Sequence, residues 1–118
     1  MLKNNMTAAG LISEIQKMTQ PRPAAIIFGL EMGWSLERVI FFTWGQAKDC
    51  QSTLTPLARQ ILSRQLRHIS LQYVFWFNSR GDCMPVYGLC WEIFEEFGLL
   101  WGELLLIYRS PEVCINAV

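Results

Sequence analysis

Apolar residues recur along most of the chain at intervals of three and four positions, which is the spacing of one face of an α-helix. The first such segment runs from Thr7 to Thr19. Pro21 and Pro23 then end it, because neither proline can donate a backbone hydrogen bond. A second helix is expected to open at Pro23 and to continue to Met32, with Gly33 as its C-cap.

Ser35 is typical of a helix N-cap, and Glu37 places a carboxylate in the first turn, where it suits the helix dipole. The helix that begins there carries apolar residues as far as Trp44. A short polar connection is expected from Gly45 to Ser52.

The clearest helix start in the chain is Thr55-Pro56, because threonine caps a helix and proline fits its first turn. Leucine and isoleucine line one side of this helix as far as Ile69, so it is amphipathic. From Leu71 to Phe77 the pattern changes to β-forming residues and predicts a short strand. A turn is expected from Asn78 to Asp82.

Helical spacing returns after Pro85 and ends at Gly98. The apolar face of this helix is expected to comprise Val86, Leu89, Cys90, Ile93, Phe94 and Phe97, with Glu92, Glu95 and Glu96 opposite. A final apolar helix is expected from Leu100 to about Tyr108, stopped by Ser110-Pro111.

These segments predict a mainly α fold, a compact single-domain helical bundle of about six helices with at most one short β element. The domain is expected to span residues 1–118, with residues 1–6 as a flexible N-terminus. A chain of 118 residues is long enough to bury a core without disulfides or metals. Its hydrophobic fraction of 52% excludes intrinsic disorder.

The segment up to Gly10 is polar and lacks the apolar core of a signal peptide. The most apolar stretch, from Met84 to Tyr108, contains four glutamates, each costly at the centre of a bilayer. We interpret that stretch as core helix and expect a cytoplasmic protein with no membrane partner.

Residues for catalysis or cofactor binding are scarce. The four cysteines (Cys50, Cys83, Cys90 and Cys114) have no Cys-x-x-Cys spacing, and His68 is the only histidine. The glycines form no phosphate-binding loop, and no serine or cysteine lies in a recognisable nucleophile motif. We therefore expect a protein that is not an enzyme, with no catalytic residue, metal, cofactor or small-molecule substrate.

The formal net charge is zero, with ten basic and ten acidic residues, but the charge is unevenly distributed. No acidic residue lies between Asp49 and Asp82, whereas six lie from Asp82 onward with Arg109 as the only basic residue. The candidate nucleic-acid contacts in the acid-free segment are Arg59, Arg64, Arg67 and Arg80. This segment could equally face the acidic side of another subunit, or be a solvated helix face.

The C-terminal helix is apolar nearly all round, so it must be buried on every side. In a domain of this length a second copy of the chain can provide that burial, which predicts a homo-oligomer. The candidate interface residues are Leu100, Trp101, Leu104, Leu105 and Tyr108. Five tryptophans in a short chain also favour an interface over base stacking, although core positions and a ligand pocket stay open.

Several segments, read in order, resemble the catalytic domain of tyrosine recombinases, the phage-integrase family. That family has an apolar helix, then Thr-Gly-x-Arg-x-Ser-Glu leading to Leu-x-Trp. Here Ala24–Leu30 is followed by Met32-Gly33-Trp34-Ser35-Leu36-Glu37-Arg38 and ends at Thr43-Trp44. The family's Pro-Leu-Thr/Ser helix start and Tyr-Val-Phe segment are similar to Thr53–Ala58 and Tyr73–Phe75.

The resemblance spans about Pro23 to Arg109, with departures at the catalytic positions. Ser35 stands at the first catalytic arginine, Lys48 is a doubtful counterpart of the family lysine, and Leu106 replaces the histidine of the His-x-x-Arg box. Arg109 alone remains of that box, and the tyrosine nucleophile is expected to be missing. Recombination needs arginines at the phosphate and an attacking tyrosine. The resemblance therefore implies a truncated, inactive relative carried on a mobile element.

Two functions follow as hypotheses. The first is a non-enzymatic interaction module that self-associates through its apolar C-terminal helices, as a DNA-associated regulatory or accessory protein of a mobile element. The alternative is a degenerate recombinase-like DNA-binding domain that contacts phosphates through its basic helix.

Overall fold

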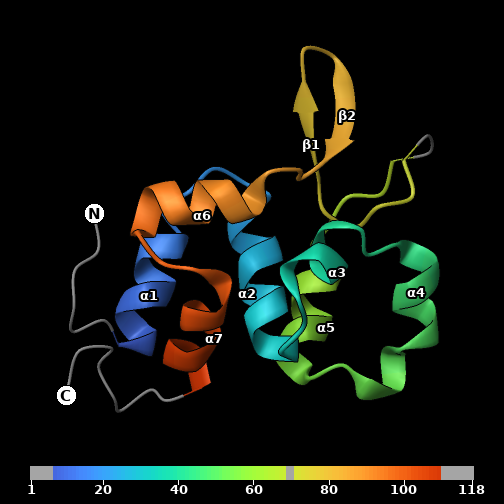
Figure 1. Cartoon of the computed structure of the whole chain (residues 1–118). Helices are drawn as coiled ribbons and strands as arrows, with labels where there is room; N and C mark the ends of the chain where they lie inside the picture. Colours follow the sequence, from blue (N-terminus) through green and yellow to red (C-terminus); the bar gives the residue numbers. More distant parts are fainter. Residues whose placement is uncertain (1–6, 69–70, 110–118) are drawn as a thin grey trace.

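The computed structural model describes residues 7–68 and 71–109 (Figure 1). Its elements are α1 (Ala8–Ile15), α2 (Arg22–Met32), α3 (Leu36–Ile40), α4 (Trp44–Asp49), the 3-10 helix η1 (Gln51–Thr53), α5 (Pro56–Ser63), β1 (Trp76–Ser79), β2 (Asp82–Pro85), α6 (Leu89–Phe97) and α7 (Trp101–Arg109). The mainly α prediction is confirmed. The expected flexible N-terminus, Ile69, Ser110-Pro111 and Cys114 lie outside the described residues.

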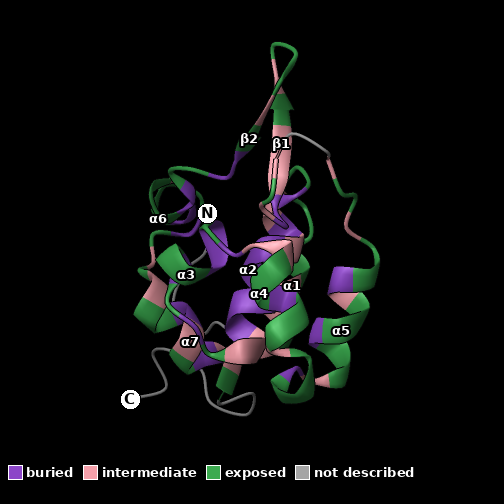
Figure 2. Cartoon of the chain, turned by 90° about the vertical axis from the view of Figure 1, so that its right-hand side faces the viewer, coloured by how far each residue is buried: buried purple, intermediate pink, exposed green. Residues whose placement is uncertain are grey.

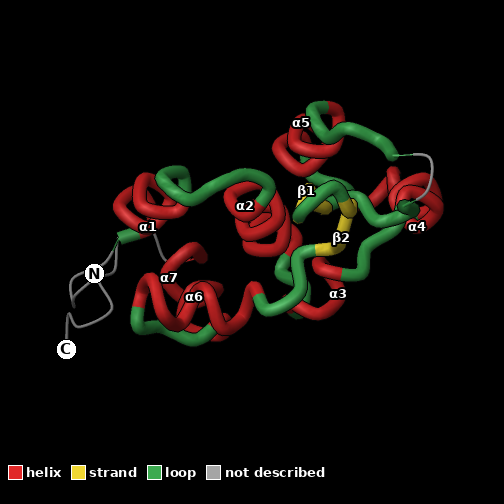
Figure 3. Tube along the Cα trace, turned by 90° about the horizontal axis from the view of Figure 1, so that it is seen from above, coloured by secondary structure: helices red, strands yellow, loops and turns green. Residues whose placement is uncertain are grey.

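Helix α2 lies between two groups of helices. Seen from above, α1, α6 and α7 lie on one side of it, and α3, α4 and α5 lie on the other (Figure 3). Helix α2 packs against α1, α3, α5 and α7. Helix α6 runs across the view in Figure 1, in a direction different from α1 and α2, so the helices do not all run side by side as in a simple bundle.

The helix boundaries expected from polar caps and glycines are confirmed. The hydroxyl of Ser35 accepts a hydrogen bond from the backbone N–H of Arg38, and the hydroxyl of Thr55 accepts one from Ala58. Gly33 ends α2 with φ +70°, in the left-handed region that glycine adopts without a steric penalty. Gly98 ends α6 in the same conformation, with φ +68°.

The helix expected to continue from Ser35 to Trp44 ends at Ile40, and the expected connection from Gly45 to Ser52 is largely helical instead. The reason is a helix N-cap at Thr43, which starts a new helix there. The Thr43 hydroxyl accepts from the backbone N–H of Gln46, and the Gln46 side chain accepts in return from the N–H of Thr43. This reciprocal capping box starts α4.

Helix α5 is shorter than expected, because it ends at Ser63 rather than Ile69. The side-chain amide of Gln65 donates to the carbonyl of Ile61 at 3.1 Å, which satisfies one of the carbonyls that a helix end leaves open. A loop then follows, in which the backbone N–H of Leu71 donates to the carbonyl of His68 at 3.1 Å, before the chain reaches β1.

The expected single strand is a hairpin, and it lies later in the chain than predicted. Strands β1 and β2 pair antiparallel with Trp76 opposite Pro85, and the expected turn connects them. Arg80 and Gly81 both have positive φ, +53° and +89°, which matches the right-handed twist of a tight hairpin. The hairpin projects away from the helices (Figures 1 and 2).

The core is centred on aromatic rings around α2. The ring of Phe28 lies 5.4 Å from Trp34, 5.3 Å from Phe42 and 5.5 Å from Phe75, measured between centroids. Buried residues also line the inner sides of the other helices (Figure 2). Within the described residues, no helix is both long and apolar enough to cross a bilayer.

Gly29 permits the closest approach between helices in this core. A Cβ atom at Gly29 would lie 2.8 Å from Cγ2 of Val39 and 2.9 Å from Cζ2 of Trp101. Both distances are shorter than a carbon–carbon contact allows, so α3 and α7 pack closely on α2 only because position 29 lacks a side chain.

Gly29→Ala is expected to destabilise the fold by about 1–3 kcal/mol, because the added methyl group overpacks the contact among α2, α3 and α7. Urea unfolding followed by circular dichroism measures the change. Gly102→Ala is the matched control, since nothing lies within 4 Å of a Cβ there. The control is expected to stabilise α7 by about 0.5–1 kcal/mol. Equal effects at the two positions would contradict the packing argument.

Candidate functional site

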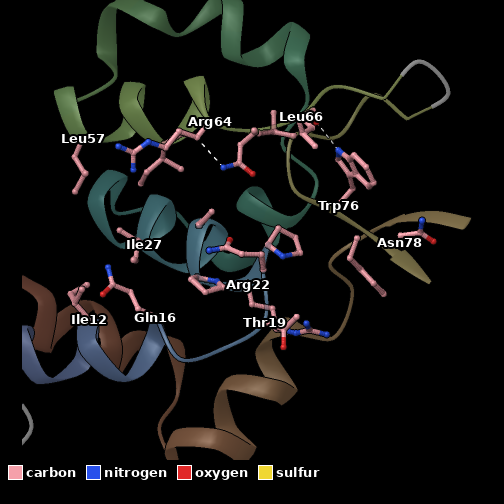
Figure 4. Close-up of a pocket in the computed structure, with 18 of the residues that line it drawn as sticks. Ile12, Gln16, Thr19, Arg22, Ile27, Leu57, Arg64, Leu66, Trp76 and Asn78 are labelled. Carbon is pink, nitrogen blue, oxygen red and sulfur yellow. Dashed lines mark hydrogen bonds between the residues drawn. The ribbon is translucent and has the colours of Figure 1, made fainter. Parts of the chain in front are cut away.

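A groove with a cavity volume of about 850 Å³ runs between α1, α2, α5 and β1 (Figure 4). Most of the side chains that line it are apolar. They include Ile12, Ala24, Ile27, Leu57, Ile61, Leu66, Val74, Trp76 and Phe77. Leu57 is 38% exposed and Leu66 is 74% exposed, so apolar surface lies open to solvent along this groove.

The polar residues of the groove carry positive charge or none. Arg22 and Arg64 line it together with glutamines, Thr19 and Asn78, and no acidic residue is among the lining residues that the structure describes. The Nε atom of Arg22 donates to the Glu92 carboxylate at 2.7 Å. Arg64 forms no ion pair within the described part of the chain.

One wall of the groove is fixed by a hydrogen bond from β1 to the segment that follows α5. The indole N–H of Trp76 donates to the carbonyl of Leu66 at 2.7 Å. The ring of His68 packs edge-on against Trp76, with 5.5 Å between centroids. These contacts hold Leu66 and Trp76 together at one end of the groove, while Ile12, Ile27 and Leu57 lie at the other (Figure 4).

A second surface, which we call the α6 face, comprises Trp91, Phe94 and Glu95. Trp91 is 62% exposed and Phe94 is 46% exposed, and their rings lie 6.4 Å apart. The opposite side of α6 carries the buried residues Leu89, Ile93 and Phe97. Glu95 is exposed and lies one helical turn after Trp91, so the α6 face combines two aromatic rings with a carboxylate.

The α6 face differs from the sequence prediction, which placed Phe94 and Cys90 on the buried side of this helix. Both are exposed. The buried stripe is narrower because α6 contacts the other helices through only one side, and the next helix in the chain turns beneath it (Figure 1). The pattern of apolar residues gave no signal for this difference, since Phe94 fits the helical spacing of Ile93 and Phe97.

The four arginines predicted to contact phosphates are all exposed, and each has different neighbours. Arg59 donates to the carbonyl of Gln51 at 3.0 Å, and the Arg67 guanidinium lies 5.0 Å from the centre of the Trp44 ring. Arg64 lines the groove. Arg80 lies at the turn of the hairpin, which projects away from α5 in both side views (Figures 1 and 2).

The predicted interface on α7 is largely inside the molecule. Leu104 is 0% exposed and belongs to the core of its own chain, which corrects its assignment to a contact between chains. The indole N–H of Trp101 donates to the Trp34 carbonyl at 2.9 Å, and the Tyr108 hydroxyl donates to Glu31. Leu105 packs against the core, whereas Leu100 is 58% exposed.

The reason for this correction is that α1 and α2 cover α7 within the same chain. A second copy is therefore not required to bury this helix. Of the five predicted interface residues, Leu100 alone keeps most of its side chain in solvent, and it lies in the loop that joins α6 to α7.

Among the positions that stand at catalytic sites in the recombinase resemblance, Ser35 and Arg109 hold structural contacts, whereas Lys48 and Leu106 are exposed. Ser35 caps α3, and Lys48 is exposed on α4. The guanidinium of Arg109 lies against Gly33 and occupies the space that a Cβ would need there. Leu106 is 66% exposed.

Comparison with known proteins finds no matching family model, no matching curated protein and no matching solved structure. Among the described residues there is also no group of three or more histidine, cysteine or acidic side chains placed to hold a metal ion.

Tyr108 lines the groove, and the pKa of its hydroxyl is raised. Burial raises the pKa of Tyr108 to about 12, and the hydrogen bond to Glu31 and the negative charge of that carboxylate act in the same direction. Below pH 10, the ordinary pKa of tyrosine, the folded and unfolded chains both keep this proton. Between pH 10 and about 12 only the unfolded chain releases it, so stability falls over that window.

Tyr108→Phe is expected to remove the step at about pH 12 from the tyrosinate absorbance titration and to flatten the loss of stability between pH 10 and about 12. Urea midpoints across that range measure the second effect. Tyr87→Phe is the control, since Tyr87 is 53% exposed, and it should leave both features in place. Persistence of the step at about pH 12 in Tyr108→Phe would contradict the assignment.

Proposed function

We propose that this chain is a non-enzymatic protein-interaction module that self-associates, and that the α6 face together with Leu100 is a contact surface. The observation that carries this proposal is the exposure of Trp91 and Phe94 side by side on one helix. Large aromatic side chains dominate the energetics of protein interfaces because they bury much apolar area with few rotatable bonds. A chain that leaves a tryptophan 62% exposed has that area available for a partner.

This proposal keeps the sequence hypothesis in a narrower form. The C-terminal part of the chain still supplies the contact, but through α6 and Leu100 rather than through the buried side of α7. A cytoplasmic location and a role as an accessory protein of a mobile element are proposed on the sequence alone.

The alternative, DNA binding through the basic helix, has less support. Arg59 and Arg67 already contact Gln51 and Trp44, and Arg80 lies apart on the hairpin. A phosphate-binding surface normally gathers several free cations. We therefore rank self-association first.

Light scattering after size exclusion, over a series of protein concentrations, tests self-association. The unaltered chain is expected to have a solution mass above that of one chain, and Trp91→Ser combined with Phe94→Ser is expected to weaken the association by about 30-fold or more, the equivalent of about 2 kcal/mol at an interface centre. Met84→Ser is the control, because Met84 is 36% exposed on the hairpin, away from α6. A single-chain mass at every concentration would refute the proposal.

The same measurement, repeated with a short DNA duplex, distinguishes the alternative. We expect no shift of mass on adding the duplex. A salt-sensitive shift that Arg64→Glu with Arg67→Glu removes would instead support DNA binding, because phosphate contacts weaken steeply as salt rises.

A further inference from the structure

We propose that the α6 face of one copy docks into the groove of a second copy, with Glu95 opposite Arg64. This inference rests on the proposed self-association and names the second surface that takes part in it. The groove between α1, α2, α5 and β1 would receive Trp91 and Phe94, and each copy would offer both surfaces.

The two surfaces match in apolar character. The α6 face presents two rings separated by three positions on a helix, and such pairs are typical anchors for an amphipathic helix bound in a groove. The groove offers an apolar lining of about 850 Å³, with Leu57 and Leu66 exposed along it. That volume is large enough for two aromatic side chains.

The two surfaces also match in charge. The groove carries Arg22 and Arg64 and no acidic residue among its described lining, whereas α6 carries Glu92, Glu95 and Glu96 and no basic residue. Arg22 and Glu92 already pair within one chain. Arg64 and Glu95 form no ion pair within the described residues, so each surface has one charge available for the other.

A contact between two α6 faces fits less well. It would place Glu95 of one copy beside Glu95 of the next, and like charges in a closed interface are costly. Lys17 and Arg22, which border the same hollow as Glu95, already pair with Glu14 and Glu92. Docking in the groove places the same carboxylate beside a guanidinium. The groove and the α6 face are different surfaces, so the contact is heterologous: it joins one patch of the first copy to a different patch of the second.

Paired charge reversal tests this arrangement. Arg64→Glu alone and Glu95→Arg alone are each expected to weaken self-association by about tenfold or more, as reversal of a close interfacial charge does. An equimolar mixture of the two variants is expected to recover the affinity of the unaltered chain, because every contact between unlike copies again joins opposite charges. Sedimentation equilibrium gives the dissociation constants. Arg59→Glu, on α5 but outside the groove, is the matched control and should associate normally.

Each outcome decides between the proposals. A monomeric unaltered chain would refute self-association itself. Association that is lost with Trp91→Ser and Phe94→Ser but kept with Arg64→Glu would leave self-association standing and overturn the groove as its partner surface. Two weakened variants that do not recover on mixing would overturn the pairing of Arg64 with Glu95.

Arg64→Ala replaces Arg64→Glu if circular dichroism shows that the Arg64→Glu variant unfolds. Arg64→Ala is expected to weaken the association less than Arg64→Glu.

Discussion

The packing of α2 against four other helices is the constraint on which the remaining structure depends. Because Gly29 has no side chain, Val39 of α3 and Trp101 of α7 both approach the backbone of α2 closely at this position. Phe28 beside it is fully buried against the rings of Trp34, Phe42 and Phe75. Because close-packed interiors transmit small displacements, a shift of α2 would move both α1 and α5, which line the groove together with α2 itself.

The parts of the fold that depend on local chemistry could be predicted from the sequence. Ser35, Thr55, Gly33 and Gly98 mark helix ends because one side chain, or the lack of one, satisfies the backbone at that point. Helix α4 could have been found in the same way from Thr43 and Gln46, but the glycine at position 45 favoured a loop. The sequence predicted one strand where the structure has a two-stranded hairpin. The hairpin turn holds Arg80 at positive φ, a conformation that arginine rarely adopts, so the sequence did not indicate a tight turn there.

The candidate surfaces were harder to predict, for a different reason. Periodicity indicates which residues of a helix share a face, but not whether another helix covers that face. Phe94 and Phe97 fit the same apolar pattern, yet Phe97 is 2% exposed and Phe94 is 46% exposed. The groove brings together side chains from Ile12 to Tyr108, and only the tertiary arrangement reveals that they line a common space.

The hairpin gives the molecule a part that can be altered without touching its core. A Cβ at Gly81 would meet nothing within 4 Å, and the strands beside it extend away from the helices (Figure 2). Exposed loop tips of this kind tolerate insertions. A fluorophore or an affinity tag placed between Arg80 and Asp82 would therefore remain distant from α6, while the base of the same hairpin, at Trp76 and Phe77, borders the groove. The hairpin thus offers a reporter position one strand away from the groove.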